Sequence, residues 1–150
     1  MAVKPIPDGY HTVTPYIVCN GAADVIRFVK EAFGATEQCP PMTGPDGTVH
    51  HAELKIGDSP IMLSEACGEQ KAMPAMIYLY VEDVDKVYAQ AIKAGGKTIK
   101  PVENQFYGDR SGGVSDNAGN QWWIGTHVED VSPEELRKRA AEKHKEKVAK

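Results

Sequence analysis

The sequence predicts an α+β domain that contains two copies of a β-α-β-β-β unit, followed by a helical tail. Alternating strand patterns and periodic helix patterns occur in the same order in each half of the chain. The halves also align at a constant offset of 62 positions, which relates Tyr16 to Tyr78, Val25 to Val87, Ala32 to Ala94 and Gly34 to Gly96. Like residues at like places in each element indicate duplication of one structural unit.

The first unit is predicted from its β-branched and apolar residues. Residues 11–19 read as a strand, and apolar residues then recur with helical spacing over 22–33. Gly34 supplies the left-handed residue that ends the helix. A short strand near 35–39, a turn over 40–47 and a hairpin of strands 49–56 and 60–65 complete the unit. Residues 66–74 are predicted to form a linker.

The second unit repeats this order. We expect a strand over 75–81, a helix over 83–94 that Gly95 and Gly96 close, and a strand over 97–102. A long loop is predicted through 106–113, before a hairpin that turns at 116–120 and returns over 121–125. Ser132, Pro133 and Glu135 form a capping box, which predicts a helix to about residue 150. Its lysine-rich end is interpreted as a solvated helix, with a polyanion-binding tail as the alternative.

Composition narrows the class of protein. The net charge of −4 argues against a general nucleic-acid binder, and no run of 18 apolar residues predicts a membrane span. The N-terminus lacks the apolar stretch of a signal peptide. Three widely spaced cysteines without a C-x-x-C pair are typical of a reducing compartment. We therefore expect a cytoplasmic protein with neither nucleic-acid nor membrane partners.

The alternation of side chains in residues 75–81 predicts a binding surface. Ile77, Leu79 and Val81 form an aliphatic side that suits packing against a helix. Met76, Tyr78 and Tyr80 form the opposite side. This amphipathic side suits the wall of a cavity that a small molecule can contact.

Four stretches resemble the vicinal oxygen chelate superfamily of glyoxalases, bleomycin-resistance proteins and extradiol dioxygenases. The superfamily's first β-α element resembles residues 13–35, VTPYIVCNGAADVIRFVKEAFGA, and its second unit begins like residues 76–97, MIYLYVEDVDKVYAQAIKAGGK. The PhnB-like branch is similar in its closing hairpin, FYGDRSGGVSDNAGNQWW, and in the earlier HAELKIGDSPIMLSE. The resemblance covers residues 10–128 and implies a glyoxalase/bleomycin-resistance-like fold. It implies units over 10–66 and 75–128, an arm over 1–9 and a C-terminal helix over 129–150.

The resemblance also locates the positions at which superfamily enzymes hold a divalent metal. It places them on Thr14, Met62, Met76 and Trp123. None of these carries the imidazole or carboxylate that such metals require. We therefore expect no cofactor and no catalytic residue, and we interpret the chain as a small-molecule-binding protein like the bleomycin-resistance members. Its expected ligand-binding residues are Thr14, Tyr16, Met62, Met76, Tyr78, Tyr80, Tyr107, Arg110 and Trp123.

Other functions stay open. A metal-dependent lyase, isomerase or dioxygenase is possible if His51 and Glu53, which share one strand face, bind a metal with a third ligand such as Glu65 or His11. A dimer module without a ligand is a third reading. Arg110 either binds an anionic ligand group or pairs with an acidic neighbour, Asp109 or Glu103. The resemblance further implies a homodimer, since superfamily members build their cups from four units.

Overall fold

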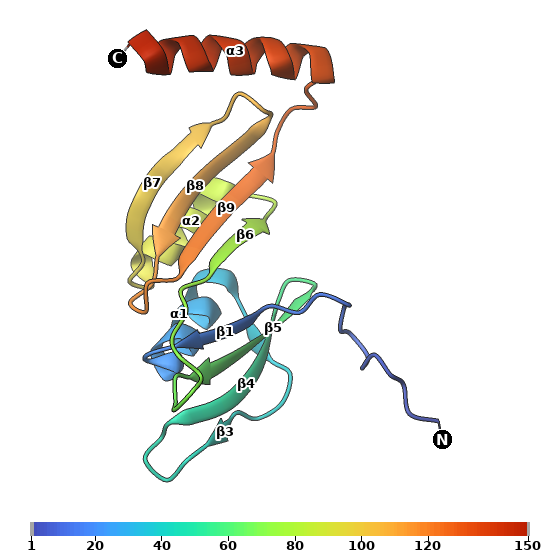
Figure 1. The fold of residues 1–150 in the computed structure, drawn as a ribbon, viewed down its shortest axis with the longest axis vertical. Helices are drawn as coiled ribbons and strands as arrows, with labels where there is room; N and C mark the ends of the chain where they lie inside the picture. The colour runs from blue at the N-terminus through green and yellow to red at the C-terminus, as the bar shows by residue number, and fades with distance from the viewer. Residues whose placement is uncertain (1, 150) are drawn as a thin grey trace.

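The structure, a computed structural model that describes residues 2–149, contains two β-sheets in the order that the repeat predicts. The first sheet has the strand order β1-β5-β4-β2, with β3 paired to β4. Figure 1 shows β1, β5, β4 and β3 of this sheet. Its strands are β1 (Tyr16–Cys19), β2 (Thr36–Glu37), β3 (Met42–Thr43), β4 (Val49–Ile56) and β5 (Ser59–Glu65). The second has the order β6-β9-β8-β7. Its strands are β6 (Met76–Tyr80), β7 (Lys97–Asn104), β8 (Asp109–Ser115) and β9 (Gln121–His127). The predicted α+β fold class is thus confirmed.

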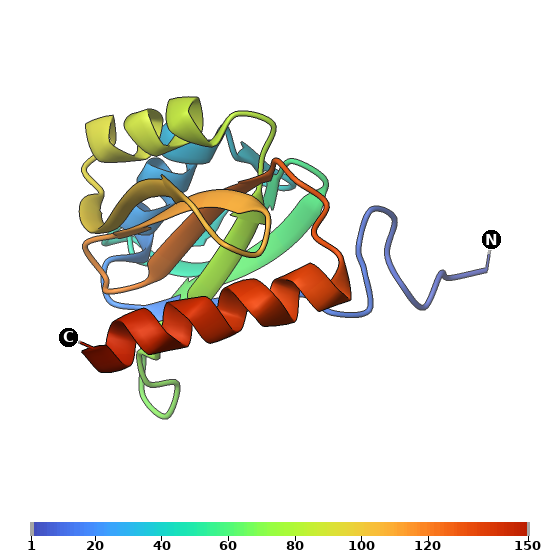
Figure 2. The same cartoon turned by 90° about the horizontal axis from the view of Figure 1, so that it is seen from above.

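The two units share their internal topology. In each sheet the first strand runs parallel to the last, and Tyr16 pairs with Met62 as Tyr78 pairs with Trp123. The helices α1 (Ala22–Phe33) and α2 (Val84–Lys93) contact each other and lie on the same side of the molecule (Figure 2). In the part of the chain that the structure describes, the opposite faces of both sheets carry no helix of their own unit (Figure 2). We call each of these an open face.

One apolar core spans both units. Trp122 of β9 is fully buried, and its ring lies 5.3 Å from Phe33 and 6.4 Å from Phe28, both in α1. Asp24 of α1 also accepts a hydrogen bond from the Asn117 amide in the β8–β9 turn. Burying large aromatic side chains removes much apolar area from water, so this cluster fixes one unit against the other.

The helix ends follow the predicted stop signals with one shift. Gly34 adopts a left-handed φ of 67° after α1, as predicted. After α2 the left-handed residue is Gly95, with φ of 106°, whereas Gly96 lies in ordinary backbone space. A Cβ on Gly96 would lie 2.8 Å from the Ala91 carbonyl oxygen, so this glycine is required by a close approach instead. The 62-residue offset therefore shortens by one residue at the end of the second helix.

Several predicted elements were wrong in their extent. The predicted turn over 40–47 contains β3, and two other differences are larger. The first strand begins at Tyr16 rather than residue 11, and Val13 is exposed. The predicted loop over 106–113 instead contains most of β8, which pairs with both β7 and β9. Its glycines suggested a loop, but Gly112 and Gly113 are buried within the strand. A Cβ on Gly112 would lie 3.0 Å from Val102, and a Cβ on Gly113 would lie 2.8 Å from the Trp123 ring.

The predicted helical tail is present as α3 (Pro133–Ala149). Ser132 accepts a hydrogen bond from the Glu135 amide at its start, which confirms the cap; Lys150 lies outside the described residues. The helix buries no residue fully and lies beyond the second sheet (Figure 1). Arg139 anchors it through Glu129 at 2.8 Å and the Phe106 carbonyl oxygen at 3.1 Å. Within residues 2–149, no helix is long and apolar enough to cross a membrane.

Candidate functional site

The open face of the second sheet carries most of the predicted aromatic residues. Ile77 and Leu79 pack against the core, as the alternation predicts, whereas Met76, Tyr78 and Tyr80 are 67%, 39% and 68% exposed. On β9 the same alternation directs Trp122 into the core, and leaves its neighbour Trp123 half-buried on the open face. The two strands therefore present their large side chains to one surface.

Tyr78 and Trp123 lie flat on this surface because glycines stand beside them. A Cβ on Gly125 would lie 2.2 Å from Tyr78 Oη, and a Cβ on Gly113 would lie 2.8 Å from the Trp123 ring. Each ring therefore occupies the space that a side chain of the next strand would fill. The Tyr80 ring packs against Tyr78 with 5.0 Å between centroids. We call Tyr78, Tyr80 and Trp123 the aromatic floor.

A buried carboxylate fixes one end of the aromatic floor. Asp109, at the start of β8, is only 4% exposed. It accepts hydrogen bonds from Tyr80 Oη at 2.9 Å and Tyr78 Oη at 3.1 Å, and its other oxygen lies 2.9 Å from His127 Nδ1. His127 Nε2 in turn lies 2.8 Å from Asp130. Three donors thus satisfy the carboxylate and hold both phenols in place.

These contacts set the charges of the cluster. Burial acts to raise the pKa of Asp109, but the hydrogen bonds from His127, Tyr80 and Tyr78 outweigh it and leave this pKa below its ordinary value. The bond to Asp109, followed by that to Asp130, raises the pKa of His127. Burial and then the hydrogen bond to Asp109 raise the pKa of Tyr78, so its phenol stays neutral. The aromatic floor therefore rests on an ionised carboxylate.

A cavity of about 990 Å³ opens beside the aromatic floor, between the units. The β4–β5 turn forms one wall, and β6, the end of β9 and α2 form the other. Its lining residues are Phe33, Ile56, Gly57, Asp58, Ser59, Tyr78, Leu79, Tyr80, Val81, Glu82, Val87, Gln90, Thr126 and His127. Of the nine predicted ligand-binding residues, Tyr78 and Tyr80 line it, and Trp123 adjoins it as the strand partner of Tyr78.

The other predicted residues are divided between the two sheets. Met76 and Tyr107 belong to the second unit, and Tyr107 is close enough to influence the pKa of Tyr78 and Tyr80. Thr14, Tyr16 and Met62 belong to the first. Tyr16 Oη lies 3.2 Å from His51 Nδ1, and Thr14 donates to the His11 carbonyl oxygen.

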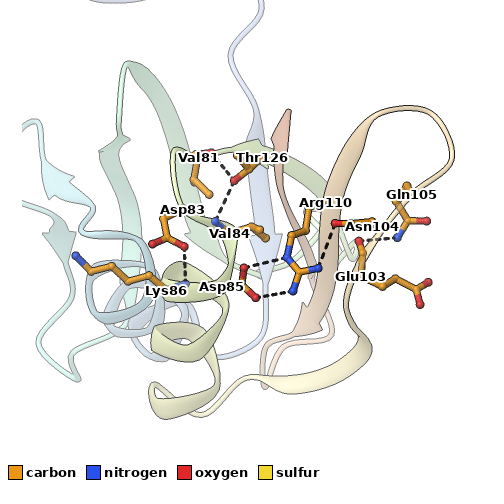
Figure 3. Close-up of polar contacts among 10 residues, drawn as sticks. All are labelled: Val81, Asp83, Val84, Asp85, Lys86, Glu103, Asn104, Gln105, Arg110 and Thr126. Carbon is orange, nitrogen blue, oxygen red and sulfur yellow. Dashed lines mark hydrogen bonds and ion pairs between the residues drawn. The ribbon is translucent and has the colours of Figure 1, made fainter. Parts of the chain in front are cut away.

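Arg110 lies on the helix-covered side of the second sheet. Its guanidinium makes two 2.9 Å hydrogen bonds to Asp85 of α2 and a third to Asn104 at 3.2 Å (Figure 3). The acidic partner is therefore Asp85, not Asp109 or Glu103. Because β8 is a strand, Asp109 and Arg110 point to opposite faces, and the guanidinium is directed away from the aromatic floor.

The residues that the resemblance assigns to the superfamily's metal positions do not suit a divalent metal. Their donors would be a hydroxyl, two thioethers and an indole, from Thr14, Met62, Met76 and Trp123. Within residues 2–149, no three His, Cys, Asp or Glu side chains are arranged to hold an ion. These four side chains therefore offer no suitable set of ligands for a divalent metal.

His51 and Glu53, the alternative candidates for metal ligands, form hydrogen bonds with other side chains. Their side chains are 3.5 Å apart, but Glu53 also accepts hydrogen bonds from Tyr10 and Cys39. The bond from Tyr10 is the main cause that lowers the pKa of Glu53. Glu65, one of the two residues considered as a third ligand beside His11, accepts hydrogen bonds from the Gly21 and Ala22 amides at the start of α1 instead.

Sequence reasoning missed Asp109 and His127 as site residues. Asp109 was placed in the predicted loop, and His127 lay beyond the predicted end of the last strand. Had β8 been predicted, the alternation of Asp109, Ser111 and Gly113 would have directed the carboxylate to the open face.

Comparison with known proteins identifies the family. Residues 10–124 match the Glyoxalase/Bleomycin resistance protein/Dioxygenase superfamily. The chain belongs to this superfamily. An uncharacterized protein of Mycobacterium bovis, Mb0911c, is 34% identical over 135 residues, which cover 83% of this chain and 88% of the relative. YjdN of Escherichia coli is 30% identical over 100 residues, which cover 63% of this chain and 68% of YjdN.

Solved structures share the fold at lower identity. TioX from Micromonospora sp. ML1 superposes with a TM-score of 0.62 at 19% identity, and the match covers 77% of this chain and 99% of TioX. A PhnB protein from Bacillus cereus gives 0.61 at 18% identity, with coverage of 77% and 99%. These likenesses agree with the PhnB-like resemblance of the sequence and concern the fold alone.

Proposed function

We propose that this superfamily member binds a small molecule without a metal, on the aromatic floor and in the cavity beside it. The observation that carries the proposal is the flat placement of Tyr78 and Trp123 over glycines on an open sheet face. A protein that needed these rings only as core would cover them, yet Tyr78 and Tyr80 stay 39% and 68% exposed. We expect the protein to act in the cytoplasm as a homodimer.

The geometry favours binding by preorganisation. The Asp109 hydrogen bonds fix the orientation of Tyr78 and Tyr80 before a ligand arrives, so little side-chain entropy is lost on binding. Ring stacking contributes about 0.5–1.5 kcal/mol for each aromatic contact beyond the area that is buried. Two or three such contacts, together with buried apolar area, suit micromolar affinity for a flat ligand.

The alternative is an enzyme with a metal near His51 and Glu53. It has less support because Tyr10 and Cys39 share the Glu53 carboxylate and Glu65 is bound at α1. Titration with Zn²⁺ and Mn²⁺ tests it, since stoichiometric binding that is lost in His51→Ala would favour this alternative.

The proposed function is tested with the neutral dye Nile red and protein treated with EDTA. We expect fluorescence enhancement that saturates, and a roughly tenfold weaker affinity in Tyr78→Leu. Tyr88→Leu is the matched control, because Tyr88 lies on α2 and bonds Thr98 away from the aromatic floor. Equal loss in both folded variants, or enhancement only after metal is added, would overturn the proposal.

A further inference from the structure

The side chains around the cavity are unevenly charged. Among its lining residues, Asp58 and Glu82 carry carboxylates, His127 is the only basic side chain, and neither lysine nor arginine occurs. His127 is itself held between two carboxylates, Asp109 and Asp130. Even with His127 protonated, the charges of Asp58, Glu82 and His127 sum to a negative value. The cavity therefore favours positive charge.

The two lining carboxylates differ in their surroundings. A hydrogen bond from Ser59 is the main cause that lowers the pKa of Asp58, and nearby His11 and Lys55 also lower it. Glu82, between β6 and α2, is exposed and has no hydrogen-bond or ion-pair partner within the described chain. Glu82 is therefore the carboxylate that is available to a ligand.

The aromatic floor adds a second attraction for positive charge. The face of an aromatic ring carries partial negative charge and attracts a cation placed above it. Tyr78 and Tyr80 turn their hydroxyl hydrogens toward Asp109, which is buried and ionised, so this negative charge lies at the edge of both rings. A cation above the rings is attracted by both features, whereas an anion is repelled by both.

From these observations we infer that the cavity selects a planar organic cation, such as a quaternised or protonated heteroaromatic ring. The flat part of the ligand lies on Tyr78 and Tyr80, and its positive charge is directed toward Glu82. This inference rests on the proposed function and specifies the class of ligand for the same site.

Three probes of similar shape separate charge from apolar contact. N-methylquinolinium is a cation, methylnaphthalene is its neutral counterpart and naphthoate is an anion. Titrated by calorimetry at low salt and neutral pH, N-methylquinolinium should bind at least about tenfold more tightly than methylnaphthalene. Naphthoate should bind most weakly, and added salt should reduce the preference for the cation.

Matched variants assign the preference to the cavity. Glu82→Gln should weaken N-methylquinolinium binding several-fold and leave methylnaphthalene unchanged. Glu134→Gln, which removes the same charge from the exposed start of α3, should change neither. Tyr80→Leu should weaken the cation more than the neutral probe, because it removes an aromatic face but keeps apolar volume.

The outcomes distinguish this inference from the proposed function. Equal or tighter binding of methylnaphthalene or naphthoate would overturn the cation inference and leave small-molecule binding intact. A preference that survives Glu82→Gln together with Tyr80→Leu would also overturn it. If none of the probes binds, the inference fails, and the Nile red titration decides separately whether the aromatic floor binds ligands.

Discussion

At the scale of single residues, two glycines give Tyr78 and Trp123 the space in which they lie across neighbouring strands. Gly113 and Gly125 lie under Trp123 and Tyr78, and neither has a positive φ, so they are required for space and not for backbone freedom. Small residues beneath large ones let aromatic rings lie across neighbouring strands. The site can therefore be removed without touching an aromatic residue.

We predict that Gly125→Ala displaces the Tyr78 phenol from Asp109 and weakens Nile red binding, because the new Cβ would lie 2.2 Å from Tyr78 Oη. Overpacking should cost about 1–3 kcal/mol in the free energy of unfolding, measured in urea. Gly125→Ala should cost much less in a Tyr78→Ala background, because the clash is then gone. Additive costs in this double-mutant cycle would contradict the close packing of the two residues.

The Asp109–His127 pair predicts a pH dependence of stability. The folded protein raises the pKa of His127, so its contribution should be fully present below the ordinary value of about 6.5 and lost as pH rises through the raised value. The pKa of Asp109 is lowered in the folded protein, so the stability that Asp109 contributes is lost in acid, as pH falls through the lowered value.

We therefore expect the stability difference between wild type and His127→Ala to be largest in mildly acidic solution, below about pH 6.5 but above the pKa of Asp109. Thermal unfolding from pH about 4 to 9 measures this difference. A difference that grows with rising pH through the neutral range would contradict the assigned sign.

Residue-level sequence reasoning succeeded where alternation was regular. Met76, Tyr78 and Tyr80 alternate with buried aliphatic neighbours in β6, and this pattern placed them on the open face. The partner of Arg110 was not predictable, because Asp85 lies 25 positions away on another element. The hydrogen-bond partners of Asp109 were not predictable for the same reason, since its three donors come from β6 and β9.

At the scale of elements, the β8–β9 turn depends on one buried acid. Asp116 accepts hydrogen bonds from the Ala118 and Asn120 amides, the Asn120 side chain and Trp122 Nε1. The Asn120 side chain in turn accepts a hydrogen bond from the amide of Ala75, the residue before β6. The turn therefore ties three parts of the second unit together.

We predict that Asp116→Ala lowers the free energy of unfolding by about 2–4 kcal/mol, because it leaves several buried donors without a partner. Asp46→Ala is the control, since Asp46 bonds Thr48 in a comparable but exposed turn. Its removal should cost less than about 1 kcal/mol. Similar losses in the two variants, measured in urea, would contradict the role of burial.

The C-terminal helix gives a second element-level prediction. A chain that ends at Val131 should keep its fold, with unfolding free energy within about 1 kcal/mol of the full chain, because α3 buries no residue fully. Circular dichroism and urea unfolding measure this. A large decrease in the free energy of unfolding would show that Arg139 and its contacts belong to the domain. It would contradict the predicted boundary near residue 128.

Element boundaries were the least predictable feature of the fold. The β8 strand was missed because its glycines resemble a loop when the crossing side chains, Val102 and Trp123, are unknown. The first strand was predicted too long because residues 11–14 are strand-like in composition but lie before the paired part of the sheet. Contact with β5 begins at Pro15, whose carbonyl oxygen accepts a hydrogen bond from the Met62 amide. Both errors arise from tertiary contacts that override local preference.

At the scale of the whole molecule, duplication made the fold predictable. The repeat predicted the order of strands and helices in both units, and the TM-scores near 0.6 to TioX and the PhnB protein agree with this fold. How the units pack on each other was not predictable, because that contact joins Phe28 and Phe33 to Trp122 across nearly the whole domain.

The predicted homodimer belongs to this scale. The outer strand β7 pairs only with β8, and exposed apolar side chains outside the aromatic floor include Met42 of the first sheet. Unpaired strand edges and apolar patches are usually covered in assemblies. Sedimentation equilibrium at micromolar concentration should give twice the mass of the chain, and the mass of a single chain would contradict the prediction.

Metal-free binding on the aromatic floor is tested most directly by the two tryptophan indole N–H resonances. Trp123 lies in the aromatic floor, whereas Trp122 on the same strand is buried and bonded to Asp116, so it is an internal control. In EDTA-treated protein titrated with Nile red, with N-methylquinolinium and with methylnaphthalene, at least one probe should shift the Trp123 resonance and leave that of Trp122 nearly unchanged. A Trp123 resonance that no probe moves, or that moves only after a divalent metal is added, would contradict the account.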